Sequence, residues 1–218
     1  MANSAEARTE ILRRIRVATG PAVDRATIEA EWNGIERAYK HVTSIDQEGR
    51  LHQLEDRLLD YDAGVYRSTR DGIRALVEKI LGERGKRTMA VPSGIRAEWL
   101  PASVTFVEDT RGDVSSINRC EGVLTSATLA IAETGTIVLQ DAPGQGRRAV
   151  TLLPDYHLCL VQAANIVQTV PEAIALFQPT AHLATTFFSG PSATADIEMT
   201  RIKGVHGPRF VDVILILD

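Results

Sequence analysis

The 218-residue sequence has only two cysteines, 5% aromatic residues and no long apolar run. Cys120 and Cys159 stand alone, and no group of cysteines and histidines has the spacing of a zinc or iron–sulfur site, so we expect neither a metal nor a cofactor. No apolar run approaches the ~20 residues needed to cross a bilayer. The net charge of −4 provides no general attraction to nucleic acid or to an anionic membrane.

The first 20 residues lack the apolar core of a signal peptide. Two isolated cysteines are typical of a reducing compartment. The sequence therefore predicts a cytoplasmic protein with no membrane span and no nucleic-acid partner. With 44% apolar residues, the chain is long enough to bury a core without disulfides.

Charge is distributed unevenly along the chain. Residues 1–88 hold 16 basic and 15 acidic residues, whereas residues 89–218 hold 8 and 13. The spacing of apolar residues in the first part predicts helices over residues 4–18, 26–62 and 71–83. We therefore expect a helical amino-terminal region, residues 1–87, packed on an α/β core of residues 88–218.

From residue 88 the pattern changes to short apolar strands alternating with helices. The predicted strands are residues 88–91, 104–107, 122–126, 136–139, 157–162, 185–189 and 211–217, and the predicted helices are residues 171–177 and 192–201. This alternation predicts a three-layer α/β fold, with a mixed, mostly parallel sheet and helices on both faces. The short connection between residues 122–126 and 136–139 indicates antiparallel pairing.

A loop rich in glycine and arginine follows the strand that is predicted to end at residue 139. Gly144 and Gly146 allow backbone amides to approach an anion, and Arg147 and Arg148 can bind a phosphate or a carboxylate. The alternative is a flexible hairpin with solvated charges. The loop matches neither a P-loop nor a dinucleotide-binding motif.

A second loop, residues 189–198, leads into a predicted helix. Ser189 and Gly190 precede the turn, and Ser192 and Thr194 would add hydroxyl donors to the free amides of the first helical turn. These groups form a candidate anion-binding site. The alternative is that Ser192 simply caps the helix.

Two further positions are candidates for catalysis. His206 lies in a glycine-bounded loop, where it can act as a general acid or base, and the nearby Arg209 can bind a carboxylate. Glu133 precedes a glycine turn and would serve as a nucleophile or base if burial raised its pKa. Structural roles are the alternative for both His206 and Glu133.

Five segments of the chain occur in the order seen in one protein family. They are TSATLAIAETGT (residues 125–136), GQGRR (144–148), LPDYH (153–157), SGPSATADIE (189–198) and GVHGPR (204–209). The chain thereby resembles the LUD domain family, most strongly over residues 88–218. The resemblance implies a fold like that of the NagB/RpiA/CoA-transferase group, and a role in oxidising L-lactate to pyruvate alongside iron–sulfur partner proteins.

Three functional hypotheses follow. In the first, the protein is a non-redox component of L-lactate utilisation that binds a small anionic metabolite and the iron–sulfur subunits; a homo-oligomer is compatible with it. In the second, it is a free-standing enzyme resembling an acyl transferase, a CoA transferase or an isomerase, with Glu133 and His206 as the catalytic pair. In the third, it is a purely structural subunit whose arginine-rich first helix binds an acidic partner. Whether the chain is an enzyme stays open at this point.

Overall fold

The computed structural model describes residues 4–39, 44–112, 114–194, 202–204 and 206–218, with the backbone alone at residues 4, 194, 202 and 203. The chain divides into two compact units, Met1–Tyr39 and Lys40–Asp218. The first unit contains two helices, α1 (Ser4–Thr19) and α2 (Arg25–Gly34). The bounds of α1 confirm the first predicted helix. Asp24 caps α2 by accepting a hydrogen bond from the Thr27 N–H at 3.0 Å.

A six-stranded sheet organises the second unit. Its strand order is β1-β12-β7-β4-β2-β3, and neighbouring strands run parallel throughout. The strands are β1 (Gly64–Ser68), β2 (Thr88–Pro92), β3 (Thr105–Asp109), β4 (Gly122–Ser126), β7 (Tyr156–Gln162) and β12 (Phe210–Ile216). A parallel sheet is buried on both faces, which explains the apolar runs from residue 88 onwards.

A second, four-stranded sheet has the order β8-β5-β6-β9. Its strands are β5 (Leu129–Ile131), β6 (Thr136–Gln140), β8 (Ile166–Val167) and β9 (Thr185–Phe188). β6 pairs antiparallel with both β5 and β9, so antiparallel pairing is present as expected. The expected partner was wrong, however, because the short strand β5 lies between β4 and β6 in the sequence and β4 joins the first sheet instead.

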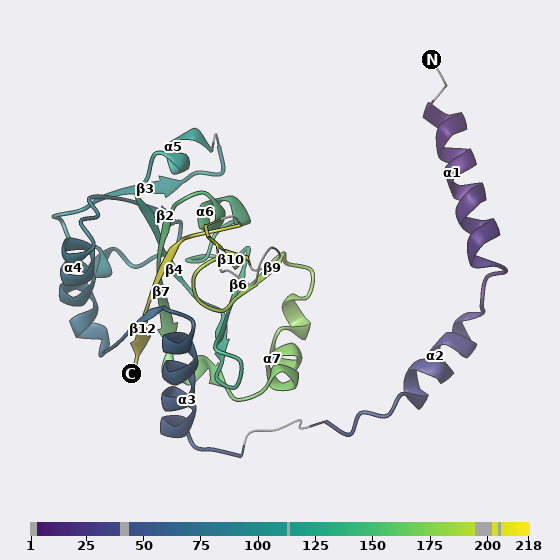
Figure 1. Ribbon diagram of the computed structural model, residues 1–218, viewed down its shortest axis with the longest axis horizontal. Coiled ribbons are helices and arrows are strands. Elements are labelled where there is room, and N and C mark those ends of the chain that lie inside the picture. The colour runs from purple at the N-terminus through teal and green to yellow at the C-terminus, as the bar shows by residue number, and fades with distance from the viewer. Residues whose placement is uncertain (1–3, 40–43, 113, 195–201, 205) are drawn as a thin grey trace. The chain divides into compact units, whose positions relative to one another are not determined.

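Alternate side chains of the six-stranded sheet enter two different cores. On one face, Leu158 and Ile214 pack with Val77 of α4 (Ile73–Glu83). On the other face, Val161 and Val213 pack with α3 (Gln47–Asp60) and the second sheet, while α5 (Ser115–Asn118) and α6 (Arg148–Leu152) cover β2 and β4. This layered arrangement confirms the predicted mixed α/β fold class (Figure 1).

The remaining elements are short. α7 (Val170–Leu176) packs against the second sheet, and it begins with a capping box between Thr169 and Glu172. Four 3₁₀ turns lie at Arg70–Gly72, Ala97–Trp99, Ala163–Asn165 and Gln178–Thr180. The short strands β10 (Ala193–Thr194) and β11 (Ile202–Lys203) complete the described elements.

The helix predicted over residues 192–201 is wrong where the structure describes it. β10 and β11 form an antiparallel pair, with Ala193 opposite Lys203. The Ser192 N–H donates to the carbonyl of Pro208 at 2.9 Å, and the Ser192 carbonyl accepts from the Gly204 N–H at 3.0 Å, so Ser192 bonds across the chain and starts no helix. Residues 195–201 lie outside the described residues. The expected boundary between residues 87 and 88, and the packing of the helical region on the core, stay predictions.

Candidate functional site

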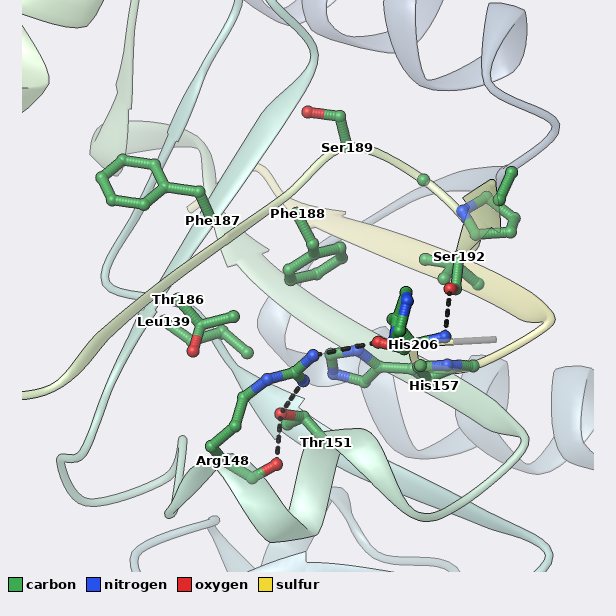
Figure 2. Close-up of a pocket in the computed structure, with 16 residues that line it drawn as sticks. Leu139, Arg148, Thr151, His157, Thr186, Phe187, Phe188, Ser189, Ser192 and His206 are labelled. Carbon is green, nitrogen blue, oxygen red and sulfur yellow. Dashed lines mark hydrogen bonds between the residues drawn. The ribbon is translucent and has the colours of Figure 1, made fainter. Parts of the chain in front are cut away.

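A cavity of about 230 Å³ lies between the two sheets. β7 and β12 contribute His157 and Val211 to its wall, and β6 contributes Leu139 from the facing sheet. α6, β9 with the loop that follows it, and the loop before β12 complete the lining (Figure 2). The polar side chains among the lining residues are those of Arg148, Thr151, His157, Thr186, Ser189, Ser192 and His206.

Arg148 supplies the positive charge of this cavity. Its Nη1 donates to Thr151 Oγ1 at 3.1 Å, and its Nη2 donates to the carbonyl oxygen of His206 at 3.1 Å. Both acceptors are neutral, and within the described part of the chain no ion pair joins Arg148 to a carboxylate. A guanidinium without a counter-charge in a partly enclosed cavity favours an anionic ligand, above all a planar carboxylate.

His157 lies beside Arg148 in the cavity wall and is only 2% exposed. Its Nε2 forms a hydrogen bond of 2.8 Å with Thr125 Oγ1, and its ring packs against Phe188 with the ring centroids 5.1 Å apart. Burial is the larger cause, and the nearby charge of Arg148 the smaller one, of a pKa of His157 that is lowered from 6.5 to about 3. The imidazole is therefore neutral at physiological pH.

The loops after β9 and before β12 meet at the cavity. Ser192 Oγ accepts a hydrogen bond from the His206 N–H at 3.1 Å. Ser189 shares a hydrogen bond of 2.9 Å with Thr136 Oγ1, which directs its hydroxyl toward β6. Gly190 has φ +73°, and a Cβ there would lie 2.6 Å from that of Tyr61. The structure thus brings Ser189, Gly190, Ser192 and His206 to the same cavity as Arg148.

Gly144 and Gly146 pack against the carboxyl ends of β2 and β4. The Gly144 N–H donates to the Ser93 carbonyl at 2.6 Å, and the Gly144 carbonyl accepts from the Ser126 N–H at 2.7 Å. Gly146 has φ +74°, and a Cβ there would lie 2.9 Å from Cβ of Pro92. Both glycines allow close backbone packing, and neither lines the cavity of about 230 Å³. Gly146 lines a second hollow of about 130 Å³ together with Arg147 and Arg148.

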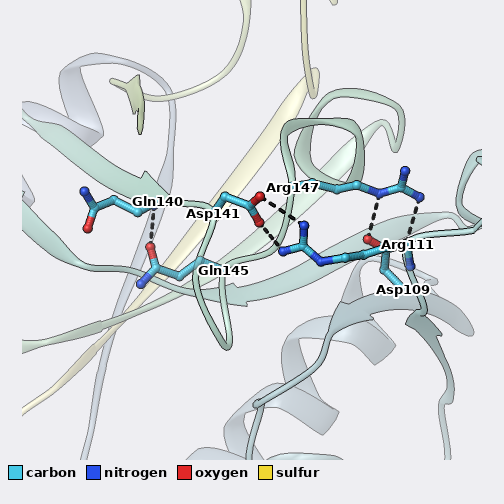
Figure 3. A network of polar contacts seen from close by, with 6 residues as sticks. All are labelled: Asp109, Arg111, Gln140, Asp141, Gln145 and Arg147. Carbon is cyan, nitrogen blue, oxygen red and sulfur yellow. Dashed lines mark hydrogen bonds and ion pairs between the residues drawn. The ribbon is translucent and has the colours of Figure 1, made fainter. Parts of the chain in front are cut away.

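Arg147 diverges from its neighbour Arg148 (Figure 3). Its guanidinium binds Asp109 through Nε and Nη2 at 3.0 and 2.9 Å. Burial raises the pKa of Asp109, but hydrogen bonds from Arg147 and from the Arg111 N–H outweigh it and hold that pKa below its usual value. Arg111 in turn forms an ion pair with Asp141. Arg147 is therefore paired with a carboxylate of the protein, although it lines the hollow of about 130 Å³ together with Arg148, and their binding of one anion stays a prediction.

Two other predicted residues, Arg209 and Glu133, lie outside the cavity lining. Arg209 binds both carboxylate oxygens of Asp155 at 2.6 Å. Glu133 is exposed in the turn between β5 and β6, and its backbone N–H donates to the carbonyl of Gln168 at 3.1 Å. Thr194 lies in β10, with its backbone alone described. The catalytic and binding roles assigned to these residues stay predictions.

Comparison with known proteins places the chain in a family. The model of the LUD domain matches residues 3–216. The chain belongs to the LUD domain family. It is 41% identical over 169 residues to "Lactate utilization protein C" of Deinococcus radiodurans, an alignment covering 76% of this chain and 79% of the relative. A protein of the same description from Exiguobacterium sp. is 33% identical over 159 residues, covering 68% and 67%.

A solved structure has the same fold. The crystal structure of a DUF162 family protein from Deinococcus radiodurans matches with a TM-score of 0.68 and 34% identity, covering 79% of this chain and 99% of that one. These findings confirm the resemblance drawn from the five sequence segments. In the described part of this LUD domain protein, no helix has the length and apolar character to cross a membrane.

The polar side chains of the candidate site include three that the sequence analysis did not select: Thr151, His157 and Thr186. His157 stands in the run YHLCLV, which reads as a buried strand, and it has no metal-ligand spacing to another histidine. The available signal was a polar residue inside an apolar strand, because buried polar side chains need a partner. The described residues contain no group of three or more side chains that could hold a metal ion. The polar side chains that line the cavity can bind an anion and form hydrogen bonds.

Proposed function

We propose that this LUD domain protein is a non-redox component of L-lactate utilisation that binds a small carboxylate in the cavity beside Arg148. The proposed role in lactate utilisation is supported by relatives described as lactate utilization protein C, the first at 41% identity over 169 residues. The proposed ligand is supported by the cavity itself. Its volume of about 230 Å³ suits a metabolite of a few heavy atoms.

The observation that carries the ligand assignment is the environment of Arg148. The described ion pairs of the neighbouring region engage Arg111, Arg147 and Arg209 with aspartates. The partners of Arg148 within the described residues are neutral oxygens. A carboxylate would supply the missing counter-charge through two parallel hydrogen bonds. The apolar wall formed by Leu139, Phe188 and Val211 would contact the rest of a small organic acid.

Redox chemistry would reside in partner proteins. The chain has two isolated cysteines, Cys120 and Cys159, both buried, and neither belongs to a cluster-binding motif. We therefore propose that it acts together with iron–sulfur subunits, in the cytoplasm, as a protein that binds the acid. His206 lines the cavity whereas Glu133 does not, and Glu133 is exposed, so the geometry favours this role over a transferase that uses the pair.

The ligand proposal is tested by Arg148→Gln, with Arg96→Gln as a matched control. Arg96 is an exposed arginine that pairs with Glu98 and lies outside the cavity lining. Calorimetric titration of the purified full chain with L-lactate should give a weakening of about tenfold to a hundredfold for Arg148→Gln, because a charge-assisted hydrogen bond contributes about 1.5–3 kcal/mol. Arg96→Gln should bind like the wild type. Equal affinities in all three proteins would refute the carboxylate site.

The role in metabolism is tested separately. A strain of Deinococcus radiodurans that lacks its own lactate utilization protein C is supplied with the wild-type protein or with either variant, and growth on L-lactate is measured. We expect growth with the wild type and Arg96→Gln but not with Arg148→Gln. Affinity purification of the tagged chain from such cells should recover iron and the visible absorbance of iron–sulfur clusters. Growth on L-lactate without any supplied protein would overturn the proposed role.

A further inference from the structure

The guanidinium of Arg148 is held by two acceptors from different parts of the chain. Its Nη1 donates to Thr151 Oγ1, three residues further along the same helix, and its Nη2 donates to the carbonyl oxygen of His206, both at 3.1 Å (Figure 2). Hydrogen bonds at two nitrogens of a planar group define the orientation of its plane. The guanidinium therefore has a defined orientation at the cavity wall before a ligand binds.

Ser192 holds the residue that supplies the second acceptor. Its Oγ accepts a hydrogen bond from the His206 N–H at 3.1 Å, so the main chain of His206 is bound to Ser192 through its N–H and to Arg148 through its carbonyl. The backbone of Ser192 also bonds to the same loop on either side of His206. Its N–H donates to the Pro208 carbonyl at 2.9 Å, and its carbonyl accepts from the Gly204 N–H at 3.0 Å. Ser192 thus fixes this loop at three points.

Ser192 and Arg148 also lie close together in space. A Cβ on Gly207, the residue after His206, would lie 4.0 Å from both Arg148 Nη2 and Ser192 Oγ. Ser189 lines the same cavity but shares its hydrogen bond with Thr136 of β6. Of these two serines, Ser192 is therefore the one that the described hydrogen bonds connect to Arg148.

We infer that Ser192 is a positioning residue for carboxylate binding, because it orients the main chain of His206, whose carbonyl oxygen orients Arg148. This inference rests on the proposed function, in which Arg148 binds the ligand's carboxylate. His206 takes part through its main chain, so its imidazole is dispensable. Without the Ser192 hydroxyl, the loop and the guanidinium gain freedom, and ordering them again on binding costs affinity.

The test is calorimetric titration of the full chain with L-lactate. We expect Ser192→Ala to bind about threefold to tenfold more weakly than the wild type, the cost of immobilising a long side chain on binding. Ser192→Thr keeps the hydroxyl and should restore wild-type affinity. Ser189→Ala is the matched control and should bind like the wild type, since Ser189 bonds to Thr136. His206→Ala should also bind like the wild type, because the carbonyl remains.

A double-mutant cycle separates positioning from a structural role. Ser192→Ala is also introduced into the Arg148→Gln protein, where it should have no further effect on the residual affinity, because the group that Ser192 positions is gone. A variant that merely distorts the cavity would weaken binding by the same factor in both backgrounds. That outcome would overturn the inference.

The remaining outcomes distinguish this inference from the proposed function. Wild-type affinity in Ser192→Ala, with Arg148→Gln still binding weakly, would overturn the inference and leave the carboxylate site standing. Weaker binding by His206→Ala would overturn the assignment to the main chain of His206. Absence of L-lactate binding by the wild type, or equal affinities of the wild type and Arg148→Gln, would overturn the proposed function together with this inference.

Discussion

His157 should cause the folded protein to lose stability in mildly acidic solution. Burial, with a smaller contribution from the charge of Arg148, lowers the pKa of its imidazole from 6.5 to about 3. The unfolded chain therefore takes up a proton near pH 6.5 that the folded chain does not accept until about pH 3. Stability that is fully present above pH 6.5 is lost as the pH falls through this window. With these two pKa values, the free energy of unfolding falls by about 2 kcal/mol between pH 7.5 and pH 5.

The assay is urea unfolding at intervals across that pH range, on the wild type and on His157→Gln. The readout is the pH dependence of the free energy of unfolding, because the glutamine changes absolute stability as well. Every other titrating group is common to the two proteins, so the difference between their curves isolates His157. The variant should lack the loss of about 2 kcal/mol. Parallel curves would refute the assignment of a buried, neutral imidazole.

Three further predictions concern residues around the sheets. Asp212→Asn should lower the free energy of unfolding by about 2 kcal/mol in urea titrations, because the fully buried carboxylate of Asp212 accepts hydrogen bonds from Arg84 at 2.6 and 2.8 Å. The loss is moderate because water partly hydrates the Arg84 side chain. Gly190→Ala should cost about 3 kcal/mol in thermal unfolding, because it combines φ +73° with a clash against Tyr61, and a loss below about 0.5 kcal/mol would contradict the packing. Glu133→Gln should change stability by less than about 0.5 kcal/mol and leave the affinity for L-lactate unaltered, whereas weaker binding would place Glu133 at the site.

The parallel sheet was predictable because its strands are buried on both faces. β7 and β12 are almost wholly apolar, and such runs stand out in a sequence. β1 was not predicted, since its sequence GVYRS is short, partly exposed and located at the sheet edge, where the demand for apolar residues is weak. The sequence also did not predict which strands form the second sheet, because the spacing of strands along the chain does not specify which of them pair.

Part of the candidate site was predictable for a different reason. Ser189, Ser192 and His206 lie in glycine-containing loops, which sequence reasoning correctly selects as places where polar groups gather, and the structure brings them to one cavity. The helix start expected at Ser192 was wrong because hydrogen bonds to residues 204 and 208 outweigh the local capping signal. These partners are distant in the sequence, so no local pattern identifies them.

The adjacent arginines Arg147 and Arg148 show that the partner of a charged side chain decides whether its charge is available to a ligand. Residue type and position are alike, and both follow the same glycine loop. Arg147 meets the nearly buried carboxylate of Asp109 at the end of β3, and this pair uses its charge inside the protein. Among the described residues, Arg148 donates to a hydroxyl and to a carbonyl oxygen and forms no ion pair. Residues 89–218 carry 13 acidic against 8 basic residues, so counter-charges are plentiful there. A guanidinium that none of the described carboxylates neutralises, at the wall of a cavity, retains its charge for a ligand.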